Sequence, residues 1–83
     1  MKPKLTWIYP AEAQRWLGDK LVEEDDDLVQ HFCWRFKQHK YLPDPPIKIH
    51  RNADGTVIIK DGIHRLSALV YNGVPEDLFV EEI

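Results

Sequence analysis

The stretch Val57–Leu69, which reads Val-Ile-Ile-Lys-Asp-Gly-Ile-His-Arg-Leu-Ser-Ala-Leu, decides the fold of this 83-residue chain. Its β-branched residues predict a strand, and after Asp61 and Gly62 the apolar spacing changes at once to that of a helix. The first amides of a helix lack intrahelical acceptors and lie at the positive end of its dipole. With His64 and Arg65 in the first turn, the pattern predicts a strand-turn-helix anion site, suited to a phosphate or a nucleotide. A tight turn with a solvated arginine is the alternative interpretation.

Residues typical of turns and helix ends divide the rest of the chain into elements. Pro10 is typical of a first helical position, Gly18 and Gly73 of helix ends, and Asn52–Gly55 of a hairpin turn. We expect strands over Leu5–Tyr9, Ile47–Arg51, Thr56–Lys60 and Leu78–Glu82, and helices over Ala11–Leu17, Asp25–Lys40 and from Ile63 to Asn72.

The predicted order, β-α-α-β-β-α-β, describes an α+β fold with helices packed on a small mixed sheet. No linker, repeat or low-complexity tract interrupts the sequence, so we expect a single domain over residues 1–83. The unbroken apolar run Val57–Ile59 predicts that its strand is covered on both faces.

The segment Asp25–Lys40 has the clearest helical pattern in the chain. Its apolar residues recur at three- and four-residue spacing and predict a core face of Leu28, Val29, Phe32, Cys33 and Phe36. The five acids Glu23–Asp27 complement the dipole at the helix start, and we expect them to cap it.

Composition excludes several classes of protein. A single cysteine rules out an intramolecular disulfide and fits a reducing compartment. No apolar run approaches the roughly 20 residues of a membrane span, and no signal peptide is visible, so we expect a cytoplasmic protein with no membrane partner. The net charge of -3 argues against a dedicated nucleic-acid binder.

Two segments together resemble the ParB/sulfiredoxin superfamily. Residues 45–50 read Pro-Pro-Ile-Lys-Ile-His, and after a hairpin residues 61–68 read Asp-Gly-Ile-His-Arg-Leu-Ser-Ala and open a helix. Members of this superfamily have Gly-X-His-Arg or Gly-X-Arg-Arg where strand meets helix, followed by a small residue such as Ala68. The resemblance covers essentially the whole chain. It implies that nucleotide phosphates bind at this helix N-terminus, beside Gly62, His64 and Arg65.

The chain departs from two branches of that superfamily. Sulfiredoxins have a catalytic cysteine directly before the His-Arg pair, where this chain has Ile63. The only thiol, Cys33, lies on the apolar side of a predicted helix, where we expect it to be buried and unreactive. Chromosome-partition members continue into a helix-turn-helix region, and we do not expect such a region within these 83 residues. The resemblance therefore implies a minimal phosphate-binding module without sulfur chemistry.

The long predicted helix supplies a second set of candidate ligands. The resemblance implies that His31 and Arg35 face the nucleotide. With about 100° per residue, His31, Arg35 and His39 form one row at the margin of the apolar face. This row lines a cleft opposite His64 and Arg65, or it is a half-exposed rim whose cations suit the helix end.

Candidates for catalysis are fewer. Some superfamily members phosphorylate a small hydroxyl substrate with a carboxylate near the end of the first strand, a place that Glu12 could occupy. Asp61 is a candidate metal-assisting carboxylate, although a cap for the following helix explains it as well. The four histidines do not have the spacing of a zinc site, so we expect no resident metal.

Two functions from different classes follow. The first is a nucleotide- or phosphate-binding domain, which extends to a small phosphotransferase or nucleotidase that takes ATP or another nucleotide with Mg²⁺, or a phosphorylated small molecule. The second is a non-enzymatic binding or inhibitor protein of phage or mobile-element type that engages a macromolecular partner. Exposure of several large aromatics together favours the second. The candidates are Trp7, Trp16, Trp34 and Tyr41.

Overall fold

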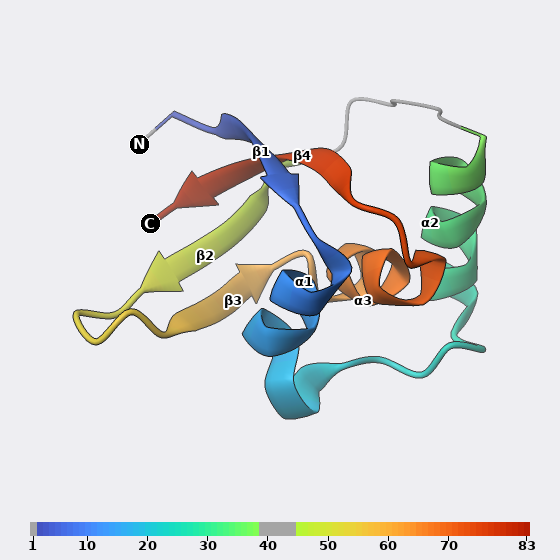
Figure 1. Cartoon of the computed structure of the whole chain (residues 1–83), viewed down its shortest axis with the longest axis horizontal. Coiled ribbons are helices and arrows are strands. Elements are labelled where there is room, and N and C mark those ends of the chain that lie inside the picture. Colours follow the sequence, from blue (N-terminus) through green and yellow to red (C-terminus); the bar gives the residue numbers. More distant parts are fainter. Residues whose placement is uncertain (1, 39–44) are drawn as a thin grey trace.

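The computed structural model describes residues 2–38 and 45–83 (Figure 1). The elements follow the predicted order. They are β1 (Lys4–Ile8), α1 (Pro10–Leu17), a 3-10 turn (Gly18–Lys20), α2 (Asp27–Lys37), β2 (Ile47–Arg51), β3 (Val57–Asp61), α3 (Ile63–Asn72) and β4 (Glu76–Glu82). The expectation of an α+β fold with a small mixed sheet is confirmed. None of the described helices is both long enough and apolar enough to cross a membrane.

The four strands form one sheet in the order β1-β4-β2-β3. Strand β4 pairs antiparallel with β1 and parallel with β2, and the hairpin strands β2 and β3 are antiparallel. The amide of Asn52 donates to the carbonyl of Thr56 at 2.8 Å and closes the predicted hairpin turn. The parallel pair requires a crossover, and α3 together with its flanking segments returns the chain from β3 at one edge to β4 inside the sheet.

One face of the sheet packs against α1 and α3, and Figure 1 shows α2 on the other side of α3 from α1. Apolar side chains from β1, β2, β3 and β4 alternate toward this inner face and meet the buried faces of the two helices. The core comprises Ile8, Ala13, Leu17, Ile47, Ile49, Ile59, Leu66, Leu69 and Val80. A smaller cluster of Val29, Cys33 and Ala68 joins α2 to α3.

The prediction that Val57–Ile59 is covered on both faces is wrong. Strand β3 lies at an edge of the sheet, and Ile58 is exposed on the side away from the helices. An unbroken apolar run is typical of a strand between two helical layers. Here all the packed helices lie on one face, so the second face of β3 has no cover among the described residues.

The helix ends agree closely with the sequence signals. Pro10 occupies the first turn of α1, and Gly18 ends that helix with a φ of +55°. Helix α2 begins at Asp27, two residues later than expected, and its predicted last residues lie outside the described part of the chain. Its core face is narrower than predicted, because Leu28 is exposed.

The acidic run before α2 caps the helix through one residue. The Asp26 carboxylate accepts hydrogen bonds from the amides of Leu28 at 2.9 Å and Val29 at 3.1 Å. The segment that leads to this cap is tied to α3, because Val22 donates to the Ser67 hydroxyl and accepts from the Tyr71 hydroxyl. Together these bonds set the position of α2 beside α3.

Replacing the capping residue Asp26 with alanine is expected to lower the free energy of unfolding by about 1 kcal/mol, because two helix amides lose their acceptor. Urea denaturation followed by circular dichroism measures this. The matched control is Asp25→Ala, which removes an exposed acid of the same run that is not the N-cap residue. Equal losses in the two variants would show that overall charge, and not the cap, is responsible.

Candidate functional site

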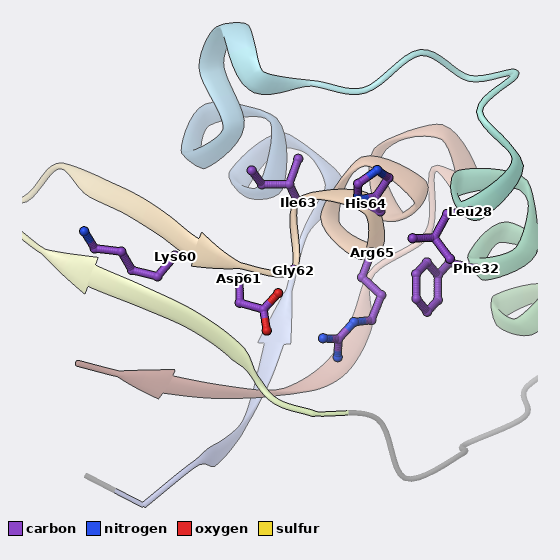
Figure 2. A pocket seen from close by; sticks show the side chains of 8 residues that line it. All are labelled: Leu28, Phe32, Lys60, Asp61, Gly62, Ile63, His64 and Arg65. Atoms are coloured by element: carbon purple, nitrogen blue, oxygen red, sulfur yellow. The ribbon is translucent and has the colours of Figure 1, made fainter.

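A pocket of about 310 Å³ lies where β3 turns into α3 (Figure 2). Its wall combines this turn with the facing side of α2, so residues more than thirty positions apart meet there. The lining residues are Leu28, Phe32, Lys60, Asp61, Gly62, Ile63, His64 and Arg65. The predicted strand-turn-helix element is therefore present, and it opens onto a concave surface.

Gly62 makes the turn possible. Its φ of +107° is a conformation that residues with a side chain rarely adopt. A Cβ at this position would also overlap the side chain of Ile47, which belongs to the buried core. The backbone thus turns directly from the end of β3 into α3 with the core packed against it.

The first amides of α3 face this turn without a side-chain cap. The first intrahelical bond is from the Leu66 amide to the Gly62 carbonyl at 3.0 Å, so the amides of residues 63–65 precede the helical ladder. Gly62 is the N-cap residue and has no side chain that could accept from them. Backbone donors and the positive end of the helix dipole therefore coincide at the wall of the pocket.

Arg65 is buried beside these amides, with only 8% of its surface exposed. The alternative interpretation of a solvated arginine is therefore wrong. Its guanidinium carbon lies 5.8 Å from the centre of the Phe32 ring, and that of Arg35 lies 5.6 Å from the same ring. Arg35 is 6% exposed. Two guanidinium groups thus lie close to one aromatic ring, and the negative charge on the faces of the ring stabilises nearby cations.

The pocket contains both signs of charge. Lys60 and Arg65 line it, and so does the Asp61 carboxylate. Figure 2 shows the Arg65 guanidinium pointing to the same side of the turn as Asp61, with Phe32 on its other side and the His64 ring directed away from it. With Arg35 also next to Phe32, the cations outnumber the acid around this side of the pocket.

Structure and sequence differ on the remaining candidates. Arg35 does not line the pocket but lies against Phe32. His31 is exposed, with its ring centre 5.6 Å from that of Phe32 and 6.5 Å from that of Trp34, so it does not form the predicted wall. Glu12 lies on α1 and does not line the pocket, whereas Asp61 does. His39 lies outside the described residues.

Four lining residues, Leu28, Phe32, Lys60 and Ile63, were not predicted as site residues. Leu28 and Phe32 were assigned to the core of α2, and Lys60 was assigned only to a strand. The spacing of Phe32 and Arg35, one helical turn apart, indicates a shared face in the sequence. Only the packing of α2 on α3 shows that this face meets Arg65. Within the described residues, no three histidine, cysteine or acidic side chains form a group that could hold a metal ion.

The single thiol lies apart from the pocket lining. Cys33 is buried in the α2–α3 cluster, as predicted, and its thiol donates to the Ala68 carbonyl across 3.5 Å. Burial raises the pKa of this thiol above its ordinary value and keeps it protonated. A protonated, enclosed thiol is a poor nucleophile.

The Cys33→Ser variant is expected to keep any ligand binding while losing about 1 kcal/mol of stability, because a hydroxyl replaces a packed thiol. In the wild type, a thiol reagent should label Cys33 slowly until denaturant is added. Mass spectrometry follows the labelling, and calorimetry follows ligand binding. Rapid labelling of the folded protein together with loss of binding in the variant would contradict a structural role.

The chain matches none of the family models, curated proteins or solved structures with which it was compared. The ParB/sulfiredoxin resemblance stays a prediction from the sequence. What the structure adds is a pocket lined by a strand-to-helix turn, the buried Arg65 and the Phe32 ring, with the buried Arg35 beside that ring but outside the lining.

Proposed function

We propose that this protein binds the phosphate group of a nucleotide or of a phosphorylated small molecule at the N-terminus of α3. One observation carries the proposal, namely that the pocket at the uncapped start of α3 is lined by the buried Arg65. An arginine held against Phe32 is preorganised, so little conformational freedom is lost when it contacts an anion.

The groups around the turn would each make a different kind of contact with a phosphate. The amides at residues 63–65 provide donors that suit the oxygens of a phosphate. Arg65 adds a planar guanidinium capable of two parallel hydrogen bonds, and Lys60 adds a point charge at the rim. Arg35, next to Phe32, contributes positive potential without lining the pocket.

Asp61 suggests how a nucleotide would be bound with Mg²⁺. Its carboxylate lies in the same pocket as the cations, and carboxylates together with phosphate oxygens are typical ligands of Mg²⁺. ATP or another nucleotide in its magnesium form is therefore a suitable ligand. A phosphotransferase or nucleotidase activity would use Asp61, since Glu12 does not line the pocket.

A second candidate function is protein binding without catalysis. Trp7 and Tyr9 are both exposed, and their rings meet edge to face with centres 6.4 Å apart. Grouped exposed aromatics are typical of protein interfaces. This surface lies on the sheet, away from the residues that line the pocket.

Thermal denaturation with a panel of ligands tests phosphate binding. Inorganic phosphate, ATP and other nucleotides, each with and without Mg²⁺, are added to the wild-type protein. A ligand at about 100 times its Kd stabilises the folded state by about 2.7 kcal/mol and raises the Tm by several degrees. The matched control is a nucleoside without phosphate, which should leave the Tm unchanged. The absence of any shift, supported by calorimetry, would contradict this function.

A further inference from the structure

The face of the sheet opposite the helices exposes a group of large apolar side chains. We call this the outer face. Alternation places on it the side chains that flank buried inner residues. Around β1 and β4 it exposes Leu5, Trp7, Tyr9 and Phe79, each by about half or more of its surface.

The register joins these side chains into one patch. Leu5 lies directly opposite Phe79 in the antiparallel pair of β1 and β4, and Trp7 lies opposite Asp77. The Trp7 ring also contacts Tyr9. Residues on β1 that face outward are therefore apolar, whereas on β4 the outward acids Asp77 and Glu81 flank Phe79.

The apolar area of this patch is comparable to the largest patch on a typical monomer, and such patches are often functional. Three aromatics and a leucine at this exposure present roughly 400 Å² on each copy, and a patch of this size is typical of an interaction site. Burying two such patches, together with the polar side chains around them, approaches the roughly 1,000 Å² that a specific interface needs.

We infer that the occupant is a second copy of this chain, packed with its outer face against this one. The two-fold axis runs along the strands between β1 and β4, so β1 of each copy lies over β4 of the other. This places Leu5 over Phe79 and Trp7 over Asp77 of the second copy. The indole N–H of Trp7 then meets an acceptor, and two aligned sheets pack about 10 Å apart.

Charge distinguishes this arrangement from others. A two-fold axis perpendicular to the strands would bring Asp77 against Glu81 of the second copy, whereas the proposed axis sets Asp77 against Trp7 and leaves Glu81 beyond the end of β1. The net charge of -3 opposes the docking of a nucleic acid or an anionic membrane. Asp77 adds negative charge next to Phe79, whereas Glu81 has Lys48 as its neighbour on β2.

The Trp7→Lys variant tests the interface by sedimentation equilibrium. We expect the wild type to dimerise, and Trp7→Lys to weaken the dimer by about 30-fold or more, as loss of a central aromatic does. The matched control is Trp34→Lys, since Trp34 on α2 is 49% exposed and Trp7 is 52% exposed. Circular dichroism confirms that both variants are folded.

Cross-linking locates the contact within the outer face. In the Cys33→Ser background, Leu5→Cys should form a covalent dimer with a short bismaleimide. Because the proposed axis runs between β1 and β4, the two Leu5 positions lie diagonally across the interface within reach of the reagent. Gln14→Cys, on an exposed position of α1, should not. A wild type that stays monomeric at about 0.5 mM would overturn the proposal, as would dimerisation of Trp7→Lys equal to that of the wild type.

This inference names the partner in the second candidate function and rests on that candidate alone. If the protein were a monomer that binds an unrelated protein through Trp7, the proposed dimer would be contradicted. The second candidate function, protein binding without catalysis, would still hold. The pocket at α3 does not include Leu5, Trp7, Tyr9 or Phe79. A monomer that binds ATP therefore leaves the phosphate-binding function intact and still overturns the dimer.

Discussion

Replacing Gly62 with alanine is expected to lower the free energy of unfolding by about 3 kcal/mol, the largest effect of any single change proposed for this protein. Two causes add. The φ of +107° strains any residue with a side chain, and the new Cβ overlaps Ile47 in the core. Because the turn connects β3 to α3, relief of either strain would shift the first turn of the helix and with it Arg65.

Gly55 provides the matched control for this prediction. Its φ is +90°, yet a Cβ there would meet no atom within 4 Å. The Gly55→Ala variant is therefore expected to lose about 1 kcal/mol, from backbone strain alone. Urea denaturation of both variants separates the overlap with Ile47 from the strain. Equal losses of unfolding free energy in the two variants would show that the core around Ile47 accommodates the added methyl group without destabilisation.

The Arg65→Ala variant is expected to weaken binding of a phosphate-containing ligand by about 1.5–3 kcal/mol, or roughly 10- to 100-fold. The loss is large because the guanidinium is buried, lies over Phe32 and lines the pocket next to the helix amides. Arg65→Lys should recover part of the affinity, since it restores the charge without the planar pair of donors. Titration calorimetry measures each affinity.

Two other arginines provide comparison variants for the binding measurement on Arg65→Ala. Arg35→Ala should have a smaller effect, because Arg35 contacts Phe32 but does not line the pocket. Arg51→Ala should have none, since Arg51 is exposed and donates to Glu82 at 2.7 Å at the far end of the hairpin strand. Denaturation curves show whether each variant remains folded at the temperature of the titration. An unchanged affinity in Arg65→Ala would exclude this residue from the site.

Local signals in the sequence determined the order of the elements and most of their limits. Pro10 and Gly18 mark the ends of α1, and Gly73 ends α3 with a φ of +76°, because these preferences act within a few residues. The strand-turn-helix element is equally local, since Gly62 separates a β-branched run from a helical pattern. The burial of Cys33 followed from helical periodicity alone.

The tertiary structure decided which faces are covered and which side chains meet. Periodicity indicates an apolar face but not whether a partner lies over it, so Leu28 and Ile58 are exposed although both were assigned to covered surfaces. Likewise, the approach of Arg65 to the Phe32 ring, which Arg35 also contacts, depends on how α2 packs beside α3. Contacts between distant segments depend on strand order and helix packing. These depend on the whole chain, so no local sequence pattern predicts them.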